Sequence, residues 1–497
     1  MELTVKNLGI STGGIRIAVM SSFDARLGSF HQGDRLILKT KKNHAVAVLD
    51  ITDNEKIVPR GTIGMFQELT EDVKVRSRQK VYADLASKPI SIEYIRKKMH
   101  GKRLSQTEIT TIVTDIVEHK LTDIEKTYFV SACFHQELSN DEVVSLTKAM
   151  INTGEIFKIN GGPIMDKHCI GGVAGNRTTA VVVPIVAASG LMIPKTSSRS
   201  ITSPAGTSDT IEVLCNVCLS IKDMKKVVKK VGGCLVWGGS MNLAPADDKI
   251  IKIEHPMSLD PVGQLLASIL AKKKAVSATH VLIDIPLGKG AKIDDENRAL
   301  NLKHKFELLG KRLGMHVKVA ITDGSEPIGN GIGPALEAKD ILWTLKDDPR
   351  GSRMLREKAV TLAGILLEMG GKARKGEGAL LANDLIDSGA AYKKFIDIIK
   401  AQEAKCIDAE KIKVGIHVYD VVSHKSGSVM FVSNDIISCI AKLAGAPKDK
   451  GAGMYLYHHK GEHVQKGDVL YRIYAENKTK LNDSIRYAKR NKGFVIQ

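Results

Sequence analysis

The chain has 497 residues, of which 43% are hydrophobic and 26% charged, so it is long enough for two to four globular domains. Its longest apolar run, Ala180–Ser189, contains Pro184 and is much shorter than the roughly 20 residues of a membrane span, so no membrane partner is expected. The formal net charge of +18 indicates an anionic partner, either a small substrate or a nucleic acid, but only 4% of residues are aromatic, which disfavours stacking surfaces for single strands.

Residues 1–84 are rich in short strand patterns. Alternating apolar runs at 15–19, 35–38 and 45–49 are separated by Gly, Asp and Asn turn signals, which predicts a small β-barrel. This region holds no reactive constellation, so we expect it to act in assembly. From about residue 85 to 156 the pattern is helical and predicts a helical domain. Ser105 begins a capping-box spacing there, and the run that starts at Ser139 opens another helix.

Residues 157–410 alternate between helix and strand patterns, and this alternation predicts a central α/β domain. A parallel or a mixed sheet is compatible with it, and a mixed sheet is our prediction. Residues 411–497 return to strand patterns and form a predicted C-terminal α+β domain. The fold class expected is therefore a multi-domain α/β protein. The helix predicted in the central domain is Ala180–Ala188, and the predicted strands are Leu191–Lys195, Val281–Ile285, Val317–Ile321, Gly427–Val432 and Lys466–Ile473.

The most informative stretch is Asp166–Thr179, where Lys167 and small polar residues lead into a glycine-rich turn and then a helix. Glycines let the backbone approach a ligand closely, and the free N–H groups and dipole of a helix start favour an anion. The stretch is therefore predicted to bind phosphate, although a plain strand-to-helix turn has the same outline. It is neither a Walker A loop nor a Gly-x-Gly-x-x-Gly fingerprint.

A second loop, Lys195–Asp209, follows a predicted strand and precedes a helix that Thr207 or Ser208 can cap. It offers the guanidinium of Arg199 and a dense set of hydroxyl groups, which suit phosphate oxygens and sugar hydroxyls. An ordinary solvated Ser/Thr loop has a similar composition, so this loop is informative chiefly in combination with the first.

The two loops together resemble the thymidine phosphorylase family, whose members carry Lys-His-Ser-x-Gly-Gly followed by Ser-x-Arg and Gly-Thr. A Leu-Ala-Pro-Ala-Asp segment and a Ser and a Lys four residues apart on one helix face also match. The resemblance covers nearly the whole chain after about residue 85, and its motifs are specific in combination. The matching residues are Lys167–Gly172, Ser197–Arg199, Gly206, Thr207, Leu243–Asp247, Ser268 and Lys272.

Within this family the chain is most similar to the archaeal AMP phosphorylases. These have an N-terminal extension of similar size, Ser-Arg-x-Ile-Thr-Ser in the second loop (Ser198–Ser203 here) and an acid in Ser-Leu-Asp-Pro (Ser258–Pro261 here). Two departures from the pyrimidine enzymes are visible. Cys169 replaces the phosphate-contacting serine, and Ile253–Pro256 lacks the arginine that reads the pyrimidine carbonyl. A purine fits this acidic stretch better, because a purine leaving group needs a proton.

The resemblance implies phosphorolysis of AMP, with CMP and UMP left open, to a free base and ribose 1,5-bisphosphate in nucleotide salvage or degradation. Asp260 is implied as the proton donor to the departing base, while a helix N-cap before Pro261 is its alternative role. Phosphate-binding roles fall on Lys167, Thr179 and Thr207. Residues implied to bind AMP are Gly172, Ser198, Arg199, Ser200, Ile201, Thr202, Ser203, Thr207, Ser268 and Lys292.

The resemblance also implies that a helix around 258–274 joins the helical domain across a cleft from the phosphate loops, so that closure excludes water. It implies a homodimer, which the N-terminal domain extends to a larger homo-oligomer. No cofactor is expected beyond inorganic phosphate as co-substrate, and no metal, because the seven cysteines are scattered and only Cys215 and Cys218 have a ligand spacing.

Two alternatives stay open: a pyrimidine-nucleoside (thymidine) phosphorylase and, in another class, a basic nucleic-acid-binding protein. The sequence contains no known nucleic-acid-binding motif, so no nucleic-acid partner is predicted. The N-terminus has no basic segment followed by an apolar stretch, and a cytoplasmic location is the expectation.

Overall fold

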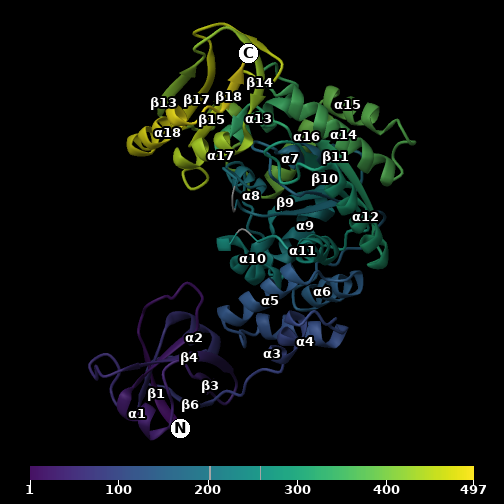
Figure 1. Ribbon diagram of the computed structural model, residues 1–497. Coiled ribbons are helices and arrows are strands. Elements are labelled where there is room, and N and C mark those ends of the chain that lie inside the picture. Colours follow the sequence, from purple (N-terminus) through teal and green to yellow (C-terminus); the bar gives the residue numbers. More distant parts are fainter. Residues whose placement is uncertain (201–202, 258) are drawn as a thin grey trace. The chain divides into compact units, whose positions relative to one another are not determined.

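The computed structural model describes residues 1–200, 203–257 and 259–497 (Figure 1). The chain divides into two compact units. The first contains Met1–Leu138 and Lys249–Pro261, and the second contains Ser139–Asp248 and Val262–Gln497. In the described part, no helix is both long and apolar enough to cross a membrane. The predicted multi-domain α/β fold, with a β-rich N-terminal part, is confirmed.

A closed six-stranded barrel forms the N-terminal part of the first unit, in the strand order β1-β5-β2-β4-β3-β6. Alternating residues of each strand face inward, as Leu36 and Leu38 do, and they fill the interior with apolar side chains. The elements are β1 (Glu2–Asn7), β2 (Ile17–Ser21), α1 (Ser22–Leu27), β3 (Arg35–Lys39), β4 (His44–Thr52), β5 (Thr62–Met65), α2 (Gln67–Val73) and β6 (Lys80–Leu85).

Three helices complete the first unit together with the segment from Lys249: α3 (Ser91–Met99), α4 (Gln106–Val117) and α5 (Asp123–His135). The predicted capping box at Ser105 is present, because its side chain accepts from the Glu108 N–H and Glu108 bonds back to the Ser105 backbone. The next two helices begin with the same device, at Thr122 and at Ser139. The helix that Ser139 caps, α6 (Asn140–Asn152), belongs to the second unit, where it packs on α11 (Val262–Ala275).

The central sheet of the second unit is parallel where a mixed sheet was predicted. β7 (Met165–Cys169), β10 (His280–Leu287) and β11 (His316–Asp323) pair in parallel in the order β11-β10-β7, and β8 (Ile193–Ser197) pairs in parallel with β9 (Gly233–Trp237). The reason is that helices connect these strands, and a helical crossover returns the chain in its original direction. The helices between these strands are α7 (Thr178–Ala188), α8 (Thr207–Ile211), α9 (Ile221–Val231), α10 (Pro245–Met257), α11 and α12 (Glu296–Arg312). Four more helices follow β11: α13 (Pro334–Lys346), α14 (Arg353–Met369), α15 (Gly378–Asp387) and α16 (Ala390–Ala401).

The C-terminal part adds antiparallel strands and two helices, as predicted. One sheet has the order β12-β15-β17-β13 and a second has the order β16-β14-β18. Its elements are β12 (Gly331–Ile332), β13 (His417–Val422), β14 (Gly427–Val432), α17 (Asn434–Leu443), β15 (Gly453–Leu456), β16 (His463–Val464), β17 (Val469–Ala475), α18 (Lys478–Arg490) and β18 (Phe494–Ile496).

Asn434, at the start of α17, ties this C-terminal part to the glycine-rich turn. Its buried side chain accepts from the Ala174 N–H at 3.1 Å and donates to the Gly324 carbonyl at 3.0 Å. The turn that follows β7 is therefore held from the side of the C-terminal domain.

Candidate active site

The glycine-rich turn lies between the carboxyl end of β7 and the start of α7. Gly171 and Gly172 have φ of +94° and +90°, which only glycine adopts without strain. A Cβ on Gly175 would stand 2.6 Å from the Ile328 carbonyl oxygen, so this glycine is required by close packing. The turn thus brings bare backbone to the edge of the sheet where ligands of parallel α/β folds bind.

Lys167 is buried beneath this turn and points at the first residues of α7. Its Nζ donates to Thr178 Oγ1 at 2.9 Å and to Thr179 Oγ1 at 3.5 Å. The same Nζ lies 3.3 Å from Asp284 Oδ2, and neither side chain is more than 1% exposed. Two of the three predicted phosphate-binding residues, Lys167 and Thr179, therefore meet at the positive end of a helix dipole.

Asp284 is the buried counter-ion of Lys167. Burial alone raises the pKa of this carboxyl, but the ammonium groups of Lys167 and Lys358 and the hydroxyl of Thr322 lower it below its usual value on balance. Asp284 therefore stays ionised and compensates the charge of Lys167. Asp284 is not among the residues predicted from sequence, although a single acid inside the apolar strand Val281–Ile285 was a usable signal, because charges are rarely buried without a partner.

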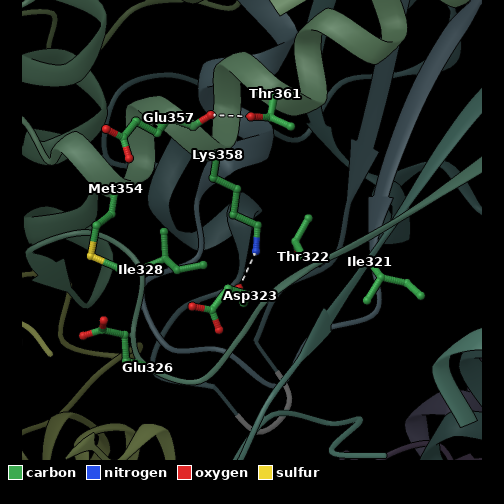
Figure 2. Close-up of a pocket in the computed structure, with 9 residues that line it drawn as sticks. All are labelled: Ile321, Thr322, Asp323, Glu326, Ile328, Met354, Glu357, Lys358 and Thr361. Atoms are coloured by element: carbon green, nitrogen blue, oxygen red, sulfur yellow. Dashed lines mark hydrogen bonds between the residues drawn. The ribbon is translucent and has the colours of Figure 1, made fainter. Parts of the chain in front are cut away.

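A cavity of about 370 Å³ opens at the carboxyl end of β11 (Figure 2). Lys358, from α14, donates to the Asp323 carbonyl oxygen at 3.3 Å and lies 3.9 Å from Asp284 Oδ1. The wall of this cavity is thus linked through Asp284 to Lys167. Of the described site residues predicted from sequence, none lines it. Its lining is Ile321, Thr322, Asp323, Glu326, Ile328, Met354, Glu357, Lys358 and Thr361.

A second buried charge cluster involves Asp166, the neighbour of Lys167 on β7. Lys273 Nζ of α11 lies 2.7 Å from Asp166 Oδ2, and Lys195 Nζ of β8 lies 3.8 Å from Asp166 Oδ1. Burial and the nearby Lys273 ammonium lower the pKa of Lys195 to about 7, although Asp166 opposes the shift. Because successive residues of a strand face opposite sides, β7 carries a lysine–carboxylate pair on each face.

His168 is electrically neutral in this surrounding. Burial lowers its pKa well below the usual value, and the ammonium groups of Lys273 and Lys195, followed by those of Lys272 and Lys167, add to the shift. A neutral imidazole offers one hydrogen-bond donor and one acceptor but cannot release the proton of an imidazolium. His168 therefore fits a hydrogen-bonding role rather than that of an acid.

Cys169 also remains uncharged, since burial and then the carboxylate of Asp284 raise the pKa of its thiol. The Asn176 amide donates to its sulfur at 3.4 Å. The residue that replaces the family's serine is therefore a neutral thiol with a partner inside the protein.

Arg177 joins the second loop to the start of α7. Its Nη2 donates to the Ala205 carbonyl at 2.7 Å, its Nη1 lies 3.5 Å from Thr207 Oγ1, and its Nε forms an ion pair with buried Glu337. Thr207, the third predicted phosphate-binding residue, is thereby placed beside the same helix end as Lys167 and Thr179. No sequence argument had singled out Arg177.

Arg199 faces two carboxylates of the protein itself. Its guanidinium binds Glu212 through two contacts of 2.7 and 2.6 Å, lies 3.2 Å from Asp209 and stacks 4.8 Å from the centre of the Trp237 ring. The Arg199 hydrogen bond lowers the pKa of Glu212 to about 2. In this structure the guanidinium of Arg199 shapes the loop, and its predicted contact with substrate stays a prediction.

The second loop is folded upon Asp209, which accepts from the backbone N–H groups of Ser200 at 2.7 Å and Gly206 at 2.9 Å. Ser203 donates to the Ala205 carbonyl at 2.8 Å, and Ser198 is exposed. The predicted residues Ile201 and Thr202, and Ser258 of the Ser-Leu-Asp-Pro motif, lie outside the described residues.

The remaining predicted residues fall into three places. Gly172 packs on Lys292, since a Cβ on the glycine would lie 2.1 Å from the Lys292 backbone nitrogen. Ser268 lies on α11 with Lys272, and Lys272 forms a 2.6 Å ion pair with Asp247, which unites two of the family motifs. Asp260 belongs to the first unit.

The helix that carries Ser268, α11, was expected to join the helical domain, and it packs on α6, which lies within the range predicted for that domain. The Lys273–Asp166 pair also ties α11 to β7 inside the second unit, because a buried carboxylate on the strand needs a cation within reach. The expected cleft between this helix and the phosphate loops stays a prediction.

Comparison with known proteins agrees with these features. Residues 161–392 match the glycosyl transferase family a/b domain, residues 92–154 its helical bundle domain, and residues 429–494 the pyrimidine nucleoside phosphorylase C-terminal domain. The AMP phosphorylase of Pyrococcus furiosus is 46% identical over 498 residues, which cover 100% of this chain and 98% of that protein. The chain belongs to the AMP phosphorylase family.

Other members of the AMP phosphorylase family show the same extent of similarity. The protein named AMP phosphorylase 1 of Archaeoglobus fulgidus is 44% identical and covers 96% of this chain and 94% of its own length. Among solved structures, the anthranilate phosphoribosyltransferase of Thermus thermophilus has a TM-score of 0.52 at 16% identity, covering 62% of this chain and 98% of that one. This likeness concerns the fold alone.

The buried pair predicts how phosphate binding responds to Lys167→Met. Removing a charged hydrogen-bond donor costs about 1.5–3 kcal/mol, so the Kd for inorganic phosphate should rise about 10- to 150-fold in calorimetry. The control is Lys167→Met combined with Asp284→Asn, which removes the carboxylate that has lost its nearest cation and should restore the melting temperature without restoring phosphate affinity. If the double variant regained both the wild-type melting temperature and the wild-type affinity for phosphate, Lys167 would have a structural role only.

The contact between Gly172 and Lys292 predicts an asymmetry between two glycine substitutions. Gly172→Ala introduces backbone strain and a collision with Lys292, whereas Gly371→Ala, at φ +71° with nothing within 4 Å, introduces strain only. We expect Gly172→Ala to lower the free energy of unfolding by about 1–3 kcal/mol more than Gly371→Ala in urea titrations. Equal losses would show that the two loops are not in tight contact.

Proposed function

We propose that this protein catalyses the phosphorolysis of AMP to adenine and ribose 1,5-bisphosphate. The observation that carries the proposal is the convergence of Lys167, Thr179 and Thr207 at the start of α7, with Asp284 as buried counter-ion. Such a site suits a small multiply charged anion rather than a polymer. The full-length similarity to proteins named AMP phosphorylase supports the choice of substrate.

In the reaction, inorganic phosphate held by these three residues attacks C1′ of the ribose, and the bond from C1′ to the base breaks. The transition state carries positive charge on the sugar and negative charge on the departing base. Residues of the second loop, with Gly172, Ser268 and Lys292, would hold the nucleotide so that C1′ faces the phosphate. Holding both reactants in this geometry supplies a large share of the rate.

The departing adenine needs a proton, and Asp260 is the proposed donor. The neutral state of His168 supports this assignment, because an imidazole without its second proton is a poor acid at neutral pH. Asp260 would deliver its proton to the ring as the bond to C1′ breaks. Its alternative role, capping the helix that begins at Val262, is compatible with the same position.

The proposed reaction uses inorganic phosphate as co-substrate and needs no metal or organic cofactor. CMP and UMP are further candidate substrates, and the product would enter nucleotide salvage or degradation. Nucleotides and phosphate are cytoplasmic metabolites, so we place the reaction in the cytoplasm. We propose a homodimer, with the N-terminal barrel extending it to a larger homo-oligomer.

AMP should be a far better substrate than adenosine, because binding energy from the 5′-phosphate lowers KM and raises kcat. Loss of a charge-assisted phosphate contact is worth about 1.5–3 kcal/mol, so kcat/KM should differ by at least about 10- to 150-fold. Phosphate-dependent release of base from AMP, adenosine, CMP and thymidine measures this. Equal kcat/KM for AMP and adenosine would refute the nucleotide preference, and a preference for thymidine would favour a pyrimidine-nucleoside phosphorylase.

Asp260→Asn should lower kcat on AMP by about 10² to 10⁴ with little change in AMP binding, because the amide keeps the shape but lacks the acidic proton. A ribose 5-phosphate carrying an activated leaving group should be much less affected, since its departure needs no protonation. If Asp260 only caps a helix, the loss should be mild, since Asn caps about as well as Asp. Near-normal kcat with an unchanged melting curve would therefore direct attention to Glu254 or His255.

A further inference from the structure

Two cations from different elements hold the carboxyl end of α4. Arg16 Nη1 donates to the Glu118 carbonyl oxygen at 3.1 Å, and Lys249 Nζ donates to the Val117 carbonyl oxygen at 2.9 Å. The last carbonyls of a helix lack partners within it and carry the negative end of the dipole, so both contacts are favourable. Arg16 comes from the barrel and Lys249 from α10, and α4 therefore links the two.

Arg16 is fixed by the barrel before it reaches α4. It directly precedes β2, and its backbone carbonyl accepts from the Val48 N–H at 2.9 Å. Its Nε lies 2.5 Å from Asp72 Oδ2 at the end of α2, and its side chain is only 12% exposed. An arginine held at both ends transmits the position of the barrel to α4 rather than adapting to it.

Lys249 is held on a second side by His119, whose backbone has a left-handed φ of +58° just after α4. Burial lowers the pKa of His119 to about 3, and the charges of Lys249 and Arg16 contribute, so the ring is neutral and can accept from the ammonium. Burial, followed by Arg16 and Lys126, lowers the pKa of Lys249 to about 8, which leaves it mostly protonated at pH 7. The remaining charges that face this pair are Asp72 and Lys252.

From Lys249, α10 runs to Met257 as a helix, and the Leu259 N–H donates to the Glu254 carbonyl of this helix at 3.1 Å. Asp260 follows directly. Independently of these bonds, Lys249–Pro261 clusters with the barrel and α3–α5 as one compact unit. The contact of Lys249 with the end of α4 therefore helps to fix the position of α10 and, through it, that of Asp260.

We infer that Arg16 and Lys249 are positioning residues for the proton donor, and that the N-terminal barrel takes part in catalysis through this junction. The inference rests on the proposed function, since it requires Asp260 to protonate the leaving base. The sequence predicts an assembly role for residues 1–84, and the junction adds a second role that does not depend on oligomer size.

The test compares Lys249→Met with Lys252→Met in the full-length protein. Lys252 is exposed on the same helix, so its loss changes the charge equally without releasing α4. We expect Lys249→Met to lower kcat on AMP about tenfold or more, with the KM for phosphate unchanged. A ribose 5-phosphate with a 4-nitrophenolate leaving group should react at the wild-type rate, and Lys252→Met should behave as wild type with both substrates.

Two further arms make the outcome decisive. Added to Asp260→Asn, Lys249→Met should cause no further loss on AMP, because the group it positions is already absent. Arg16→Met should repeat the effect of Lys249→Met, and Lys249→Arg should restore kcat. Equal losses with both substrates, or a multiplied loss in the Asp260→Asn background, would overturn the inference. If Asp260→Asn itself retains normal kcat on AMP, Asp260 is not the acid and the inference fails with the proposed mechanism. If Asp260→Asn loses kcat while Lys249→Met and Arg16→Met keep it, only the positioning role is refuted.

Discussion

The site depends on the buried ion pair between Lys167 and Asp284. Moving two charges out of water costs several kcal/mol each, and their attraction offsets this only when further hydrogen bonds satisfy the remaining atoms. Here the hydroxyls of Thr178, Thr179 and Thr322 supply them. The pair can therefore form only when β7, β10, β11 and the start of α7 keep their relative positions. The glycine turn lies between two of these elements, β7 and α7.

The need to pair buried charges also explains the arrangement of charged groups around β7. The strand places Lys167 on one face and Asp166 on the other, and each is matched by a partner from a neighbouring element. Ammonium groups on both faces leave His168 neutral, which restricts the choice of acid for a departing base. Arg177 and Asp209 then hold the described part of the second loop through hydrogen bonds from within the protein.

Much of the fold could be predicted from local sequence patterns. Alternation and turn residues gave the barrel and the strand at Gly427–Val432, and the capping spacing at Ser105 gave the start of α4. The parallel direction of the central sheet could not be read from periodicity, because a buried strand has the same apolar run in either direction. Lys167, Thr179 and Thr207 were singled out through the family motifs, and their binding of phosphate stays a prediction. Asp284 and Arg177 were missed because their partners, Lys167 and Glu337, are distant in sequence. The ion pairs of Arg199 with Asp209 and Glu212 could not be predicted, because a charge in a polar loop gives no sign of which carboxylates will approach it.

The balance of charge around β7 has a consequence for stability. Among the described residues of the two clusters, the ammonium groups of Lys167, Lys273 and Lys358 outnumber the carboxylates of Asp166 and Asp284. Lys195, whose pKa is about 7, adds part of a further positive charge at neutral pH. Under the proposed function, an inorganic phosphate bound at the start of α7 would contribute negative charge to this cluster, and any ligand that binds only the native state stabilises it by mass action. Phosphate would then stabilise the folded protein as well as react in it. The resistance of the enzyme to unfolding would then track the phosphate concentration of the cell that makes it.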